Sequence, residues 1–210
     1  MDGVILDSER LYDLTDTELL RRRNIVYDRK RVIRQVTGRS FPECTKLIMD
    51  AFAVPGDVDA IMNERRAILY QIYASSLEFM TGFLDFHALL KTKGVPSCIA
   101  TSSEDRILDF IEQKMRLSKL FGNNIFKISD VGHKSKPDPA IFLHAAEKMN
   151  ATPATCTVIE DAPNGIRAAK KAGMYCVAFA TTHRRDELGE ADVVVNAFPE
   201  IAAHLFGASS

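Results

Sequence analysis

The distribution of apolar residues changes at Thr81-Gly82, and this change constrains the fold more than any other feature of the chain. Beyond this point, short continuous apolar runs alternate with amphipathic stretches. The runs predict strands at 98–100, 125–128, 157–159, 176–180 and 193–195, with helices at 83–93, 104–115, 140–149 and 166–172. Continuous apolar strands that alternate with helices are typical of a parallel sheet buried on both faces. We therefore predict an α/β fold with a doubly wound, Rossmann-like parallel sheet.

The residues between about 9 and 80 show only helical periodicity. Leu11, Leu14 and Leu19 form a partial apolar stripe, and Ser40 with Glu43 three residues later matches a capping box that opens another helix. This segment therefore predicts an all-helical insertion. We expect residues 9–80 to form a cap and residues 1–8 and 81–210 to form the α/β core.

Charge and apolar content exclude several classes of partner. Lys and Arg total 27 against 28 Asp and Glu, which gives a formal net charge of -1 and argues against binding driven by bulk charge to nucleic acid or to a membrane surface. The basic runs at 21–23 and 29–31 lie among acidic residues, as on a solvated helix face. The longest apolar run, 175–180, is far shorter than the ~20 residues that span a bilayer. The four cysteines form no CxxC pair, which favours reduced thiols, and we expect a cytoplasmic monomer.

Polar residues gather where the predicted strands end. In a doubly wound sheet, ligands bind at the carboxyl ends of the strands. Carboxylates there suit Mg²⁺, whereas hydroxyls and a lysine suit a phosphate group. The candidate residues are Asp2, Thr101, Ser102, Lys136, Glu160 and Asp161.

Each of these features also has a purely structural interpretation. Thr101 and Ser102 could cap the helix that follows them, Lys136 could be a loop lysine, and Glu160-Asp161 could be a solvated turn. Their occurrence together, each after an apolar run, favours a functional site over these alternatives.

At these residues the sequence resembles the haloacid dehalogenase-like superfamily, whose members transfer phosphoryl groups through an aspartate nucleophile. The resemblance covers about residues 1–201 and is closest to the branch with a helical cap, which holds β-phosphoglucomutase and many sugar-phosphate phosphatases. The matching motifs are Asp2-Gly3 for the end of the first motif, Thr101 for the second, Lys136-Pro137 for the third and Glu160-Asp161 for the fourth.

The resemblance also implies a departure from the family. The first motif reads Asp-x-Asp-Gly, and Asp2 matches its second aspartate, so the nucleophile would lie one residue before Met1. Most of the first core strand would precede Met1 as well. Two interpretations follow: either Met1 is an internal methionine of an Asp-Met-Asp-Gly segment, or the chain is truncated and silent. On either interpretation we expect residues 1–210 alone to show almost no turnover.

The resemblance implies a Mg²⁺-dependent phosphatase that acts through an aspartyl-phosphate. Asp2 would act as general acid and base, and Thr101, Ser102 and Lys136 would bind the phosphoryl oxygens. Asp2, Glu160 and Asp161 would hold the metal.

A helical cap implies a small phosphorylated metabolite as substrate, with Tyr12, Arg39 and Ser40 as candidate contacts. The mutase relatives carry different residues at Tyr12, Thr37 and Phe41, which favours a phosphatase. The alternatives are a sugar-phosphate mutase and a silent metabolite-binding chain.

Overall fold

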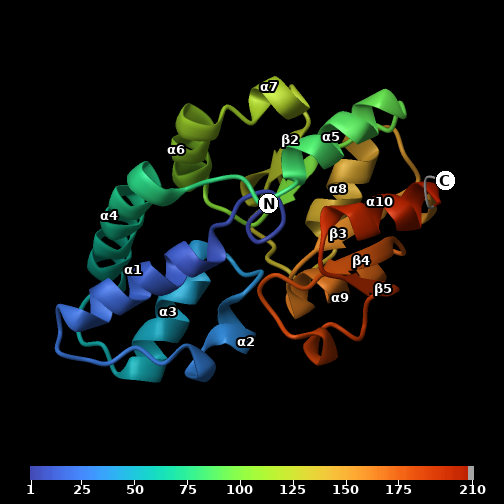
Figure 1. Ribbon diagram of the computed structural model, residues 1–210. Helices are drawn as coiled ribbons and strands as arrows, with labels where there is room; N and C mark the ends of the chain where they lie inside the picture. The colour runs from blue at the N-terminus through green and yellow to red at the C-terminus, as the bar shows by residue number, and fades with distance from the viewer. Residues whose placement is uncertain (208–210) are drawn as a thin grey trace.

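A computed structural model describes residues 1–207, and its α/β part contains two parallel sheets (Figure 1). In the first sheet β1 pairs with β2, with Ile99 opposite Ile125. In the second sheet β4 lies between β3 and β5, with Val158 opposite Cys176 and Val177 opposite Val193. The strands are β1 (Ile99–Thr101), β2 (Ile125–Lys127), β3 (Thr157–Glu160), β4 (Tyr175–Phe179) and β5 (Val193–Val195). Each overlaps a run predicted to be a strand.

Helices cover both faces of these sheets, as predicted for a doubly wound fold. Val177 and Phe179 of β4 pack in the apolar core shared with helices α5 and α10, whereas Cys176 and Ala178 pack in the core shared with α8 and α9. Neighbouring residues of one strand thus face opposite helical layers. The helices of this part are α5 (Phe83–Thr92), α6 (Asp105–Met115), α7 (Ser118–Phe121), α8 (Ala140–Lys148), α9 (Pro163–Lys171) and α10 (Phe198–Phe206). Sequence analysis predicted neither α7 nor α10.

The segment before Thr81 is helical and has an apolar core of its own. Leu19, Ile48, Phe52, Ile61 and Ile68 are buried together in it. It comprises α1 (Glu9–Arg21), α2 (Ile33–Val36), α3 (Phe41–Phe52) and α4 (Val58–Ser76). One expectation was wrong: half of the Leu14 surface is exposed, so this residue is not part of the apolar stripe.

The two parts meet where the chain passes between them. The amide of Met80 donates to the carbonyl of Ile5, and the amide of Asp7 donates to the carbonyl of Glu78. This short antiparallel contact holds the N-terminal turn against the end of the helical segment. No helix within residues 1–207 is long and apolar enough to cross a membrane.

Candidate active site

A pocket with a cavity volume of about 90 Å³ lies where helices α1 to α3 face the ends of the strands. The α/β part contributes the polar residues predicted at strand ends, and the helical segment contributes residues that cover them. Lining residues from the first group are Asp2, Thr101, Ser102, Lys136, Glu160 and Asp161. Those from the second group include Tyr12 and Arg39. The structure therefore brings side chains far apart in the sequence to one pocket.

Asp2 is held from two sides by hydroxyl groups. The Ser8 hydroxyl donates to Asp2 Oδ1 at 2.7 Å, and the Ser103 hydroxyl donates to Asp2 Oδ2 at 3.0 Å. Both donors are buried. These two bonds fix the orientation of the carboxylate at the pocket wall, as a group that moves protons requires.

Lys136 and Glu160 form a buried ion pair at the base of the pocket. The ammonium group lies 2.5 Å from Glu160 Oε1, and about 4–5% of each residue is exposed. Burial alone would raise the pKa of Glu160, but the charges of Lys136 and of the N-terminus, with the hydrogen bonds from Lys136 and the Ala162 amide, together outweigh burial and lower that pKa. Glu160 is therefore held as a carboxylate, and the ammonium group of Lys136 lies in the lining of the pocket, where an anion would meet it.

Backbone groups next to Glu160 bind its carboxylate and leave room for it. Glu160 Oε2 accepts the amides of Asp161 at 3.1 Å and Ala162 at 3.3 Å. A Cβ atom at Gly165, in the first turn of α9, would lie 2.1 Å from the Glu160 carboxyl carbon. Only glycine therefore fits at this position without displacing Glu160.

Asp161 is a buried carboxylate without a basic partner. Its Oδ2 accepts the Thr182 hydroxyl at 2.5 Å. Burial, and next the charge of Glu160, raises the pKa of Asp161 to about 7. Gly3 approaches closely, since a Cβ there would lie 2.0 Å from Asp161 Oδ2, and its φ of +63° also favours glycine.

Thr101 and Ser102 follow β1 at the same edge. Thr101 is buried, and its hydroxyl oxygen accepts the amide of Ser103 at 3.1 Å. This bond orders the turn between β1 and α6 and leaves the hydroxyl proton of Thr101 free to be donated. A hydroxyl and a lysine in one pocket provide donors for phosphoryl oxygens.

The three residues predicted to contact substrate from the helical segment lie in different places. Tyr12 of α1 and Arg39, just before α3, line the pocket. Ser40 is not among the residues that line it. Instead its amide and hydroxyl donate to Glu43, at 3.1 and 2.6 Å, in the capping box that starts α3.

The carboxylates of the pocket can be matched to the ligand needs of Mg²⁺. Within residues 1–207, no three His, Cys, Asp or Glu side chains lie close enough to enclose a metal by themselves. Mg²⁺ does not need such a cage, because it binds through one or two carboxylates and retains waters or phosphate oxygens. Asp161 fits this requirement, since it is a buried carboxylate without a basic partner and with a raised pKa. Glu160 is already bonded to Lys136 and to the backbone, so it suits an indirect role.

Sequence analysis missed the residues that position the site: Ser8, Ser103 and Thr182. A signal for Thr182 was present, because Thr181-Thr182 follows the fourth predicted strand directly, just as Thr101 follows the first. Ser103 directly follows Ser102, but it was not among the predicted site residues. Ser8 carried no signal, because its contact with Asp2 depends on the turn between residues 2 and 8.

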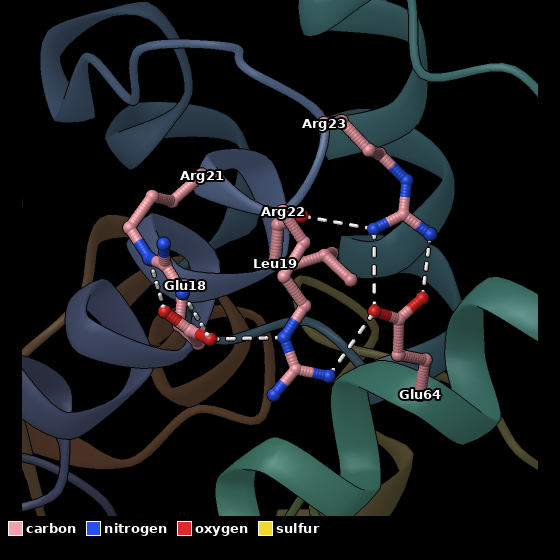
Figure 2. Close-up of polar contacts among 6 residues, drawn as sticks. All are labelled: Glu18, Leu19, Arg21, Arg22, Arg23 and Glu64. Atoms are coloured by element: carbon pink, nitrogen blue, oxygen red, sulfur yellow. Dashed lines mark hydrogen bonds and ion pairs between the residues drawn. The ribbon is translucent and has the colours of Figure 1, made fainter.

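The arginine run at 21–23 lies outside the pocket and is paired within the helical segment. Figure 2 shows Arg21 and Arg22 on Glu18, and Arg22 and Arg23 on Glu64 of α4. Glu18 is one of the nearby acidic residues used to interpret this run, whereas Glu64 could not be identified from sequence spacing. The run therefore forms intramolecular ion pairs.

Comparisons with known proteins agree with this geometry. The profile of a family of hydrolases, the haloacid dehalogenase-like hydrolases, matches residues 1–173. The chain is 31% identical to validoxylamine A 7'-phosphate phosphatase of Streptomyces hygroscopicus subsp. limoneus, over 96% of the chain and 92% of that protein. It is 27% identical to a phosphorylated carbohydrates phosphatase of Thermotoga maritima, over 83% of the chain and 79% of that protein.

A solved structure gives the same result. A hydrolase from Pseudomonas syringae, at 25% sequence identity, superposes with a TM-score of 0.78 over 100% of this chain and 96% of its own. The family match thus agrees with three features of the chain: the strand-end pocket, the four sequence motifs and the helical cap. The chain belongs to the haloacid dehalogenase-like hydrolases.

Proposed function

We propose that this protein is a Mg²⁺-dependent phosphatase that hydrolyses a phosphate monoester of a small metabolite. The observation that carries the proposal is the convergence of Asp2, Thr101, Lys136 and Asp161 on one pocket. The named relatives support it, since both are phosphatases. A sugar phosphate is the substrate class we favour, because the Thermotoga relative is named for phosphorylated carbohydrates.

Each side chain has a role in this proposal. Lys136, the Thr101 hydroxyl and the Ser102 amide bind the phosphoryl oxygens and offset their charge. Asp2 donates a proton to the leaving oxygen and then removes one from the attacking water. Asp161 and the backbone carbonyl of Asp2 would hold Mg²⁺, with Glu160 acting indirectly. Mg²⁺ bound there would offset negative charge on the phosphoryl group.

The nucleophile is an aspartate at the position immediately before Met1, by resemblance to the family. Its carboxylate oxygen bonds to phosphorus while the ester bond breaks, and the alcohol leaves with the proton of Asp2. Water then attacks the aspartyl-phosphate, gives its proton to Asp2 and releases phosphate. The aspartyl-phosphate thus replaces one difficult displacement at phosphorus with two easier ones.

We further propose that residues 9–80 form the cap and that residues 1–8 and 81–210 form the core, in a protein that works in the cytoplasm. The cap residues Tyr12 and Arg39 would contact the metabolite, and Ser40 would hold α3 in place. The space under the cap excludes a phosphoprotein and bulk water. The internal pairing of the arginine run supports the absence of a nucleic-acid partner.

A pair of extended proteins tests this proposal. One carries an apolar tetrapeptide followed by Asp before Met1, and the other carries the same tetrapeptide followed by Asn. Incubation with sugar and nucleotide monophosphates plus Mg²⁺ should give phosphate release only with Asp, and the difference should be as large as about 10⁶-fold.

Two results would contradict the proposal. The first is an Asp-extended protein that releases no phosphate from any ester although it is folded. The second is ordinary turnover by residues 1–210, about 1–10³ s⁻¹, that Asp2→Asn abolishes. In that case Asp2 would be the nucleophile.

A further inference from the structure

The polar pocket extends beyond the groups proposed to bind phosphate, toward side chains of the helical segment. Its lining there carries charge at five positions: Glu9, Asp13, Asp16, Arg39 and Arg65. A charged group in such a pocket is either held by other protein groups or left for the substrate. The hydrogen bonds of these residues therefore indicate which of them can bind the metabolite.

Three of the five residues are held by protein groups. Arg65 Nε donates to Asp16 Oδ1 at 2.7 Å, and both side chains are almost fully buried. Asp13 accepts the hydroxyl of Tyr27 at 2.8 Å and lies 2.7 Å from the guanidinium of Arg29. These groups thus stabilise the helical segment and have little capacity left for a substrate.

Glu9 differs from the other acidic residues that line the pocket. It is the first residue of α1 and is partly buried. Within residues 1–207, no protein group donates a hydrogen bond to its carboxyl group or forms an ion pair with it. Burial, and next the charges of Asp161 and Asp2, raises the pKa of Glu9. Its carboxyl group therefore lies at the pocket wall with its hydrogen-bonding capacity unused.

Neither the phosphoryl group nor a metal ion is a suitable partner for Glu9. Phosphoryl oxygens are anionic acceptors, so they would repel a carboxylate. Asp2, Glu9 and Asp161 do not enclose a metal, since no three acidic, His or Cys side chains of the described residues lie close enough together to do so. The remaining partner is a hydrogen-bond donor in the organic part of the substrate.

The residue before Glu9 ties it to the position of the ester bond. The Ser8 hydroxyl donates to Asp2 Oδ1 at 2.7 Å, and Asp2 is the proposed proton donor to the leaving oxygen. A group close to Asp2 therefore faces the first carbons of the leaving alcohol. An alkyl group there would leave the carboxyl group of Glu9 desolvated and unpaired, whereas a hydroxyl or ammonium group would donate to it.

Arg39 offers a complementary group in the same lining. Its Nε is buried and has no hydrogen-bond partner among the described residues, and its guanidinium lies 3.6 Å from Glu43. A hydroxyl can both donate and accept, so neighbouring hydroxyls of one metabolite can pair with Glu9 and with Arg39. This combination fits a polyhydroxyl compound better than an alkyl chain.

We propose that Glu9 is a substrate-binding residue that accepts a hydrogen bond from a hydroxyl or ammonium group on the carbon next to the phosphorylated carbon. The substrate is then a phosphate monoester of a sugar, a polyol or an amino alcohol, and simple alkyl phosphates are rejected. This inference rests on the proposed phosphatase function, because it assumes that phosphate binds at Thr101 and Lys136.

Three phosphate monoesters of similar size test the proposal: ethyl phosphate, 2-hydroxyethyl phosphate and 2-aminoethyl phosphate. Calorimetric titration of residues 1–210 with each ester in the presence of Mg²⁺ gives their affinities, with inorganic phosphate as the reference. We expect the hydroxyethyl and aminoethyl esters to bind at least about tenfold more tightly than ethyl phosphate, because only they satisfy Glu9.

Substitutions at Glu9 should change these ratios and leave the affinity for inorganic phosphate unchanged. Glu9→Leu should reduce both ratios to below about twofold. Glu9→Gln keeps an oxygen that accepts a hydrogen bond but removes the charge, so it should retain the preference for the hydroxyethyl ester and weaken the one for the aminoethyl ester. Glu147→Leu, at an exposed glutamate of α8, is the control and should keep the ratios of the parent.

Equal affinity of the parent for the three esters would overturn the inference, and so would ratios that persist in Glu9→Leu. A parent that prefers only one of the two donor-bearing esters would support it and identify the donor as the hydroxyl or the ammonium group. The comparison of esters on the parent needs no variant, so it decides even if Glu9→Leu folds poorly. A parent that binds no inorganic phosphate would instead contradict the proposed function, and the inference with it.

Discussion

The polar pocket has a neighbour, an apolar cavity of about 480 Å³ between β1 and β3 that we call the slot. The two cavities are built from the same strands, and Met1 lines both. In β1, Ile99 and Ala100 face the slot and the next residue, Thr101, lines the pocket. In β3, Ile159 lines the slot while Glu160 reaches both cavities. One strand thus provides apolar packing along its length and chemical groups at its carboxyl end.

The two cavities therefore contribute to different properties, the slot to stability and the pocket to phosphate binding as well. The pocket groups are held by charge and by hydrogen bonds, such as Lys136 on Glu160 and Ser103 on Asp2. Most of the side chains that line the slot are apolar. Substitutions in the slot should therefore change stability alone, whereas those in the pocket should also change phosphate binding.

The largest effect is expected for Lys136→Met. Removing the ammonium leaves the Glu160 carboxylate buried without its partner, which should cost about 3–5 kcal/mol of unfolding free energy. Phosphate binding should also be lost. Urea unfolding and phosphate titration measure the two effects, and Lys134→Met, at an exposed neighbouring lysine, is the control. A Lys136→Met protein that keeps its affinity for phosphate would contradict the claim that the pocket, and not the slot, determines phosphate binding.

A somewhat smaller effect on stability is expected for Phe86→Ala, in the slot. Phe86 is buried and packs against Phe198, so its loss should cost about 3 kcal/mol. Phosphate affinity should be unchanged, because Phe86 does not line the pocket. The same unfolding and titration experiments apply, with Leu84→Ala at an exposed position of α5 as control. A parallel loss of phosphate affinity would show that the two cavities are not separable.

Thr101→Val should have a moderate effect on both properties. The valine leaves the buried Ser103 amide without its acceptor, at a cost of about 1–2 kcal/mol. It also removes one donor to phosphate, which should weaken phosphate binding about tenfold. Thr101→Ser retains the hydroxyl and should restore both values. If Thr101→Ser behaves like Thr101→Val, the hydroxyl is not the group that matters.

The smallest effect concerns pH and a histidine that contacts Thr37, one of the residues lining the pocket. Buried His183 lies 2.8 Å from the hydroxyl of Thr37, and burial lowers the pKa of His183 although Glu187 opposes this shift. Arg29 and Arg34 also disfavour its protonation. The unfolded chain therefore binds the proton at a higher pH than the folded chain, so the contribution of His183 to stability should be constant above pH ~6.5 and fall below it. Asp161, whose pKa is raised to about 7, contributes in the opposite direction, so the effect of His183 is read from the difference between variant and parent.

Thermal unfolding between pH 8 and 5 measures this dependence. The His183→Gln protein should gain Tm relative to the parent as the pH falls from 8 to 5, and His204→Gln, at an exposed position, should not. A decline of equal slope in the His183→Gln protein would assign it to other groups.

The sequence predicted strand positions well because buried parallel strands are continuous apolar runs. It placed the α9 start at residue 166 instead of Pro163, because the first turn, Pro163-Asn164-Gly165, has the composition of a loop. It missed α10, although Phe198 and Ile201 are buried.

For the site, strand ends indicated which residues meet in the pocket, since the carboxyl ends of parallel strands share one edge. The contacts that hold them there, Ser8 on Asp2 and Thr182 on Asp161, depend on turn geometry that residue spacing does not specify. Ser40 was predicted both as a substrate contact, by resemblance to the family, and as the first residue of a capping box, from its spacing to Glu43. The structure shows the capping box.

The central claim is that Thr101, Lys136 and Asp161 form one site for a phosphate and a metal. Calorimetric titration of residues 1–210 with inorganic phosphate, with and without Mg²⁺, tests it most directly. Asp161→Asn is the decisive variant, because it removes a buried negative charge without creating an unpaired one, and Asp59→Asn at an exposed position is its control. We predict one phosphate site whose affinity rises with Mg²⁺ in the parent and in Asp59→Asn but not in Asp161→Asn. Equal Mg²⁺ dependence in Asp161→Asn would contradict the account.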